Sequence, residues 1–187
     1  MYNLYGGILE HPPKKNEETI MKFTIRDLAR QAIIASLYVV LTLAVLPIAF
    51  LDIQFRLSEV LMILVLFDKK STIGLTIGCF FANFLNPYWM PLDLVIGTLG
   101  TLLGCLLMIP FRKNAWIALM FPVLTNALLV PITLNFYLDI PYWIGVAGVG
   151  IGELTMVYIV GNLVYWPLRK NAGIKRLFPG DDKEITV

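Results

Sequence analysis

The stretch LDIQFRLSEVLMILVL, residues 51–66, places two charges beside an apolar run. Arg56 and Glu59 lie at its edge, and most of the following residues are Leu, Val, Ile or Met. A charge next to membrane-like sequence is costly, and ionisable residues inside a membrane usually mark a functional position. The reason for these two charges is therefore the first question that the sequence raises.

The composition indicates a polytopic membrane protein. The chain has 187 residues, of which 58% are hydrophobic and 15% charged, and its mean hydropathy is +0.74. Soluble domains average about 25% charged residues. Both cysteines, Cys79 and Cys105, fall inside apolar runs, so no disulfide framework is predicted. The one histidine, His11, lies in the polar N-terminal segment.

The apolar runs predict an all-α bundle of six membrane spans. A spanning helix needs about 20 apolar residues. The candidate spans are 28–50, 57–67, 71–85, 92–109, 115–134 and 142–168. The second run would cover only about 16 Å as an α-helix unless it begins near residue 51. The predicted organisation is a polar cytoplasmic leader at 1–24, a membrane domain at 25–170 and a cytoplasmic tail at 171–187.

The distribution of basic residues supports this organisation. Cytoplasmic segments of membrane proteins are enriched in Lys and Arg. With both termini inside, 14 of the 15 basic residues fall on the cytoplasmic side. Arg56 is the one exception, so its position on the predicted outer side requires an explanation.

Ionisable and amide side chains at compatible depths predict a polar pocket open to the outside. Its candidate members are Arg56, Glu59, Asp93, Glu153, Asn126, Asn83, Asn86 and Gln54. Arg56 and Glu59 are three residues apart, so a self-neutralising pair at the helix end is an equally good interpretation. Glu153 lies in mid-span among glycines, where the alternative to a ligand site is a protonated, hydrogen-bonded carboxyl. Such a pocket suits a small, flat, polar molecule.

The predicted outer loops are rich in aromatic residues. Trp89, Tyr137 and Trp143 either belong to an interfacial belt, as is common, or stack on a flat ligand.

Several enzyme classes are excluded by missing motifs. The chain has no G-x-x-x-x-G-K-[ST] loop and no H-E-x-x-H, and no histidine lies in any span to activate a serine. We therefore expect a protein that is not an enzyme, with no cofactor, metal or nucleic-acid partner.

Small residues four apart predict close helix packing. They are Gly74, Gly78 and Ala82, then Gly100 and Gly104, then Gly148 and Gly152. In the first span, Ala32, Ala35 and Ser36 form a candidate surface for a protein partner.

Four segments in their order and spacing resemble the QueT family of substrate-binding S components of energy-coupling factor (ECF) transporters. They are IQFRLSEVL, GLTIGCFFANFLNP, PLDLVIGTLGTLLG and GELTMVYIVGNLVY, and the resemblance covers about residues 25–170. It implies a multi-pass subunit in a prokaryotic cell membrane that takes up queuosine precursors, the 7-deazaguanines preQ1, preQ0 or queuine. It also implies partners, namely a transmembrane coupling protein and two cytoplasmic ATPases.

The pocket residues fit that implied ligand in specific ways. A carboxylate can accept both the ring N–H and the exocyclic amine of a guanine-like edge, and we assign this to Glu153. Arg56 or Asn126 could donate to the ring carbonyl, and Asp93 or Glu59 could pair with the aminomethyl group of preQ1. Two alternatives stay open: an S component for another small molecule such as a vitamin, and a structural or assembly subunit whose charges only pin helices.

Overall fold

The computed structural model describes residues 23–45, 55–87 and 91–178. Within these ranges the chain is helical and contains no strand. Four long apolar segments could each cross a membrane: α1 (Ile25–Ala44), α5 (Pro91–Met108) with its 3₁₀ extension η2 (Ile109–Phe111), the pair α6–α7, and the continuous run from α8 to α9. The prediction of a polytopic helical membrane protein is therefore confirmed, while the six-span count stays a prediction.

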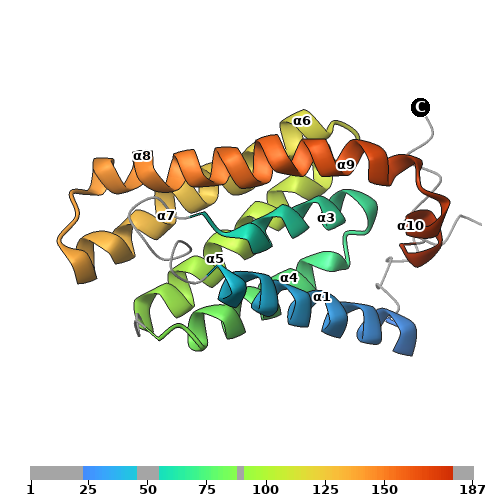
Figure 1. The fold of residues 1–187 in the computed structure, drawn as a ribbon, viewed down its shortest axis with the longest axis horizontal. Coiled ribbons are helices and arrows are strands. Elements are labelled where there is room, and N and C mark those ends of the chain that lie inside the picture. The colour runs from blue at the N-terminus through green and yellow to red at the C-terminus, as the bar shows by residue number, and fades with distance from the viewer. Residues whose placement is uncertain (1–22, 46–54, 88–90, 179–187) are drawn as a thin grey trace, which may run out of the picture.

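The run Leu57–Phe67 forms a short and largely buried segment. Residues Leu57–Ile63 are a 3₁₀ helix (η1), which continues as one α-helical turn, α3 (Leu64–Phe67). The 3₁₀ rise of about 2.0 Å per residue extends the 11-residue run to about 20 Å, rather than the 16 Å of an α-helix. Its side chains from Met62 to Phe67 are all buried. A segment that is apolar on every side belongs in a core, and this one runs through the middle of the bundle (Figure 1).

The helix pair α1–α4 packs through small residues. A Cβ added at Gly74 of α4 (Ser71–Phe84) would lie 2.8 Å from the Gln31 carbonyl oxygen, and one at Gly78 would lie 2.7 Å from the Cβ of Tyr38. Such distances leave room only for glycine, so the two backbones are in close contact. Here the four-residue spacing serves packing within the chain.

The same device joins α5 to α7 (Met120–Leu138). A Cβ at Gly104 would lie 2.8 Å from the Cα of Pro122, and one at Gly100 would lie 2.5 Å from the Oδ1 of Asn126. The short helix α6 (Ala115–Ala118) precedes α7 and is capped by the side chain of Asn114.

The last long segment is not a uniform α-helix. It consists of α8 (Tyr142–Glu153), a π-helical turn η3 (Leu154–Val160) and α9 (Gly161–Lys170). The π turn begins directly after Glu153, and such bulges are frequent at functional sites. The sequence predicted one continuous helix here, because hydrophobic periodicity does not distinguish the two winding patterns.

A further helix, α10 (Ala172–Leu177), folds back beside the start of α1 (Figure 1). Arg30 of α1 donates a hydrogen bond to the carbonyl oxygen of Leu177. The start of α1 and the helix α10 therefore lie at one end of the bundle, and the α7–α8 connection lies at the opposite end. The sequence predicted a cytoplasmic tail from residue 171 without assigning a helix to it, so α10 is an addition.

Candidate functional site

The centre of the candidate site is a buried carboxyl–amide pair between α7 and α8. The amide nitrogen of Asn126 donates to Oε1 of Glu153 at 3.1 Å, and the two residues are only 1% and 3% exposed. The remaining oxygens, Oδ1 of Asn126 and Oε2 of Glu153, are buried without a hydrogen-bond partner among the described residues. Buried polar atoms are nearly always satisfied, so two unsatisfied acceptors in one pair require an explanation.

Glycine brings the third helix of the site close to this pair. The Cα of Gly100 on α5 faces Oδ1 of Asn126 so closely that a methyl group would overlap with it. The pair is therefore enclosed by α5, α7 and α8, and its unsatisfied oxygens are shielded from the surroundings.

A buried ion pair lies closer to the bundle end that carries the α7–α8 connection. Nη2 of Arg56 contacts Oδ2 of Asp93 at 3.0 Å, and both side chains are almost completely buried. Asp93 lies in the first turn of α5, where the helix dipole favours a negative charge. Oγ1 of Thr133 lies 3.3 Å from Oδ1 of Asp93 and 2.7 Å from the carbonyl oxygen of Val130, so its one proton can go to either acceptor. The ion pair thus links the start of η1 to both α5 and α7.

Asn83 extends this cluster to α4. Its amide nitrogen donates to the main-chain oxygen of Asp93 at 3.2 Å and lies 3.5 Å from Sγ of Cys79. Asn86 is also buried, near the end of α4. Gln54 and Trp89 lie outside the described residues.

Glu59 has a partner that the sequence did not predict. The hydroxyl of Tyr38, on α1, donates to Oε1 of Glu59, and both groups are buried. One turn further along α1, Thr42 donates to the hydroxyl of Ser58 at 2.7 Å. Arg56 and Glu59 therefore face different neighbours: Arg56 contacts α5 and Glu59 contacts α1. The sequence signal for Tyr38 was a lone hydroxyl within an apolar span, which is easily taken for an interfacial aromatic residue.

The polar residues of α7 share one face of that helix. Asn126 and Thr133 are seven residues apart, which is two turns or about 10 Å along the axis. Tyr137 continues the same face one turn later, and its hydroxyl accepts a hydrogen bond from the backbone N–H of Leu92 at 3.2 Å. A polar track thus runs from the bundle end to Glu153. Thr133 was missed because a threonine within an apolar helix is ordinary.

The aromatic residues of the α7–α8 connection are not brought to Glu153. Trp143 is 74% exposed and packs edge-on against Tyr142. It lies ten residues before Glu153 on the same helix, about 15 Å away along the axis. The position of Trp143 fits an interfacial belt better than a stacking contact with a ligand held by Glu153.

The three candidate partner-contact residues on α1 do not share one exposed surface. Ala32 and Ser36 are exposed, and the Ser36 hydroxyl donates to the Ala32 carbonyl oxygen at 2.9 Å. Ala35 instead is buried, with its backbone against Gly78 of α4. A partner on this face would therefore meet Ala32 and Ser36, and Ala35 serves the contact with α4.

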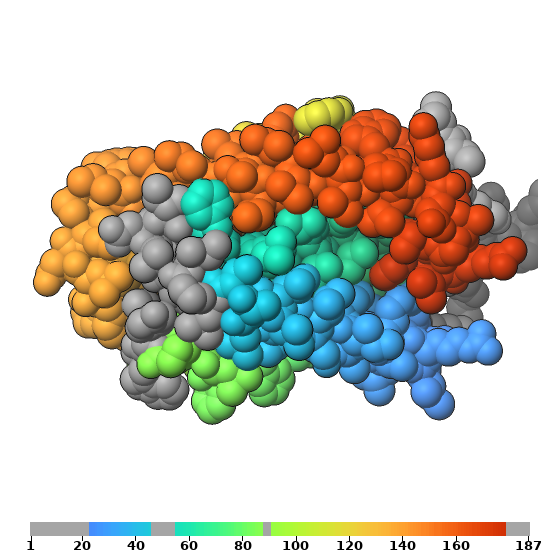
Figure 2. All heavy atoms as spheres, in the orientation of Figure 1, coloured from blue at the N-terminus to red at the C-terminus, as the bar shows by residue number. Residues whose placement is uncertain are grey.

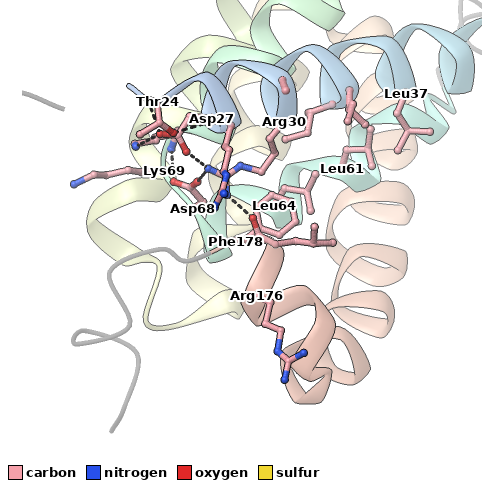
Figure 3. Close-up of a pocket in the computed structure, with 16 residues that line it drawn as sticks. Thr24, Asp27, Arg30, Leu37, Leu61, Leu64, Asp68, Lys69, Arg176 and Phe178 are labelled. Atoms are coloured by element: carbon pink, nitrogen blue, oxygen red, sulfur yellow. Dashed lines mark hydrogen bonds and ion pairs between the residues drawn. The ribbon is translucent and has the colours of Figure 1, made fainter. Parts of the chain in front are cut away.

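A groove lies at the end of the bundle where α1 begins, and its lining includes none of the predicted substrate-binding residues (Figure 3). It is not the pocket that the sequence predicted. In the described part of the chain, no group of three His, Cys, Asp or Glu side chains could hold a metal ion. The candidate site is a buried network of hydrogen-bonding and charged groups, whose donors and acceptors suit a polar organic molecule.

Comparison with known proteins identifies the family of the chain. The family model "QueT transporter" matches residues 28–170. The chain is also 30% identical to the "Queuosine precursor transporter QueT" of Lactococcus lactis subsp. cremoris (strain MG1363), over 80% of this chain and 96% of that protein. No solved structure matches the chain. The family match includes Arg56, Asp93, Asn126 and Glu153, and the chain belongs to the QueT transporter family.

Proposed function

We propose that this protein captures queuosine precursors, 7-deazaguanines such as preQ1, preQ0 or queuine, as the substrate-binding subunit of an ECF-type importer. The relative from Lactococcus lactis is described as a queuosine precursor transporter, which supports the substrate class. The observation that carries the proposal is that two buried acceptors, Oε2 of Glu153 and Oδ1 of Asn126, have no hydrogen-bond partner in the part of the chain that the structure describes.

These two acceptors suit a guanine-like edge. That edge presents a ring N–H beside an exocyclic amine, which are adjacent donors. A hydrogen bond from a neutral donor to an ionised carboxylate is about twice as strong as one between neutral groups. We assign the two donors to Glu153 and Asn126 together, because Oε1 of Glu153 is already occupied by the Asn126 amide.

Entry of the ligand requires the helices to separate. Glu153 is buried, and Gly145 of α8 packs tightly on Pro131 of α7, where an added Cβ would lie 3.0 Å from the proline Cβ. The polar face of α7 gives a path from the bundle end to Glu153, past the Arg56–Asp93 ion pair. On this proposal that end faces the outside, both termini face the cytoplasm, and the chain crosses a prokaryotic cell membrane six times.

The ion pair at Arg56 has a positioning role in this scheme. Recognition of the cationic aminomethyl group of preQ1 is assigned to the carboxylate of Asp93, which also contacts Arg56, or to Glu59, whose Oε2 has no hydrogen-bond partner among the described residues. Arg56 would lie on the outer side because the pocket needs a hydrogen-bond donor there.

Transport itself is assigned to partner proteins. A transmembrane coupling protein would dock on the exposed Ala32 and Ser36 of α1, and two cytoplasmic ATPases would supply the energy. Replacing both residues with leucine should abolish co-purification of these partners without changing substrate affinity. Unchanged co-purification would show that the coupling protein binds elsewhere.

The test of the substrate is calorimetric titration of the purified protein with preQ1, queuine, guanine and riboflavin. We expect tight binding of at least one deazaguanine and weak binding of guanine and riboflavin. Tight binding of riboflavin alone would favour the vitamin alternative. No binding of any of them by folded protein would favour a structural or assembly subunit.

A further inference from the structure

The groove at the end of the bundle where α1 begins is a second site with its own chemistry. It has a volume of about 930 Å³, near the upper limit of pockets that hold small ligands. Its walls come from α1, from η1 and α3, and from α10. The space-filling view shows a recess between α1 and α9, with η1 and α3 at its floor (Figure 2).

The rim of the groove is strongly cationic. Its lining includes five cations, Arg26, Arg30, Lys69, Lys70 and Arg176, and two carboxylates, Asp27 and Asp68, which is a net charge of +3 (5 − 2).

Internal ion pairs hold part of this charge in place. Asp27 pairs with Arg30 and, at 2.6 Å, with Lys70, and Asp68 contacts Arg30 at 3.1 Å. These pairs use both carboxylates. The net charge of +3 therefore includes cations outside this cluster, and Figure 3 shows Lys69 and Arg176 pointing away from it.

The interior of the groove is apolar. Leu61 and Leu64 form its inner wall, and Ile33 and Leu37 of α1 line it while remaining 68% and 43% exposed. From Arg26 to Leu37 the helix advances about 16 Å, roughly half of the 30 Å hydrocarbon core of a bilayer. The groove therefore extends from a cationic mouth to about the depth of one acyl chain.

We propose that this groove binds one anionic phospholipid of the bilayer. Its phosphate lies at the mouth, between Arg26 and Arg176, and one acyl chain lies against Ile33 and Leu37. A water-soluble anion would neutralise the rim but would leave the apolar walls uncovered, whereas a zwitterionic lipid would cover the walls but leave the net charge unmatched. Basic pockets between helices at the membrane surface have the chemistry that anionic headgroups require.

The site provides a lipid-dependent link between α1 and α10. The headgroup would bridge cations from both helices, which otherwise meet through the bond from Arg30 to the Leu177 carbonyl oxygen. This proposal is independent of the substrate bound near Glu153.

The test is native mass spectrometry of full-length protein released from bilayers of equimolar phosphatidylglycerol and phosphatidylcholine. The informative variant is Arg26→Gln/Arg176→Gln, which removes two rim charges but leaves the ion-pair cluster intact. The matched control is Lys113→Gln/Lys175→Gln, which removes two charges outside the groove lining.

We expect wild-type protein and the control to retain phosphatidylglycerol over phosphatidylcholine. The rim variant should lose this preference by about fivefold per charge, or about 25-fold in total. An excess of glycerol 1-phosphate or inorganic phosphate should not displace the lipid. Equal retention by the rim variant and the control, or no preference in the wild type, would overturn the proposal. Displacement by either soluble phosphate would show instead that the site binds a free anion.

Discussion

Removal of the cation from the buried Arg56–Asp93 pair should destabilise the protein strongly. In Arg56→Met, the carboxylate of Asp93 would keep the Thr133 hydroxyl, at 3.3 Å, but would lose the guanidinium 3.0 Å away. Removing one partner of a buried ion pair costs about 3–5 kcal/mol, because the remaining charge is left uncompensated. The double variant Arg56→Met/Asp93→Leu removes both charges, so it should be more stable than Arg56→Met alone.

The two buried free cysteines provide the assay. Cys79 and Cys105 become accessible to a thiol-reactive fluorescent dye only when the bundle opens. For a chain of this length, each kcal/mol corresponds to about 2–4 °C in Tm, so Arg56→Met should lower Tm by about 6–20 °C. The control Lys113→Met, at an exposed position, should change the free energy of unfolding by less than about 0.5 kcal/mol.

Two results would refute this reasoning. The first is a Tm of Arg56→Met within about 2 °C of wild type, which would correspond to less than about 1 kcal/mol. The second is a double variant whose destabilisation equals the sum of the two single losses. Additive losses would mean that the two side chains are not energetically coupled.

Three further substitutions test the helix contacts. Gly100→Ala places a Cβ 2.5 Å from Oδ1 of Asn126 and should weaken deazaguanine binding at least tenfold in calorimetry, whereas Gly150→Ala, with 3.7 Å to its nearest neighbour, should bind normally. Gly78→Ala places a Cβ 2.7 Å from that of Tyr38 and should lower the free energy of unfolding by about 1–3 kcal/mol; an unchanged Tm would contradict the close α1–α4 contact. Tyr38→Phe removes a hydrogen bond to a buried carboxyl and should cost about 1.5–3 kcal/mol in the same assay, and a neutral result would mean that this bond contributes nothing.

The sequence predicted the helices of this protein well, because apolar runs and their charged boundaries depend on local composition. It did not predict the winding of the helices. The run that begins at Leu57 is a buried 3₁₀ segment, and a π turn follows Glu153. Both features depend on the packing of neighbouring helices. The hydrophobic pattern of one segment does not indicate which helices pack against it.

The sequence singled out several residues of the buried network, but it did not predict which of them are paired. Spacing along one helix suggested Arg56 with Glu59, whereas the structure pairs Arg56 with Asp93 and Glu59 with Tyr38. These partners lie 37 and 21 residues apart, so only the packing of distant helices can determine them. Glu153 was identifiable because a carboxyl in mid-span is costly anywhere.

The most direct test of the central claim is the affinity of Glu153→Gln for preQ1, measured by calorimetry beside wild-type protein. The substitution keeps the size of the side chain but replaces a charged acceptor oxygen by a neutral amide. Loss of a charge-assisted hydrogen bond of about 1.5–3 kcal/mol predicts an affinity about 10- to 150-fold weaker, with Tm close to wild type. An affinity for preQ1 equal to that of wild type, in a folded variant, would contradict the assignment of Glu153 to the ligand.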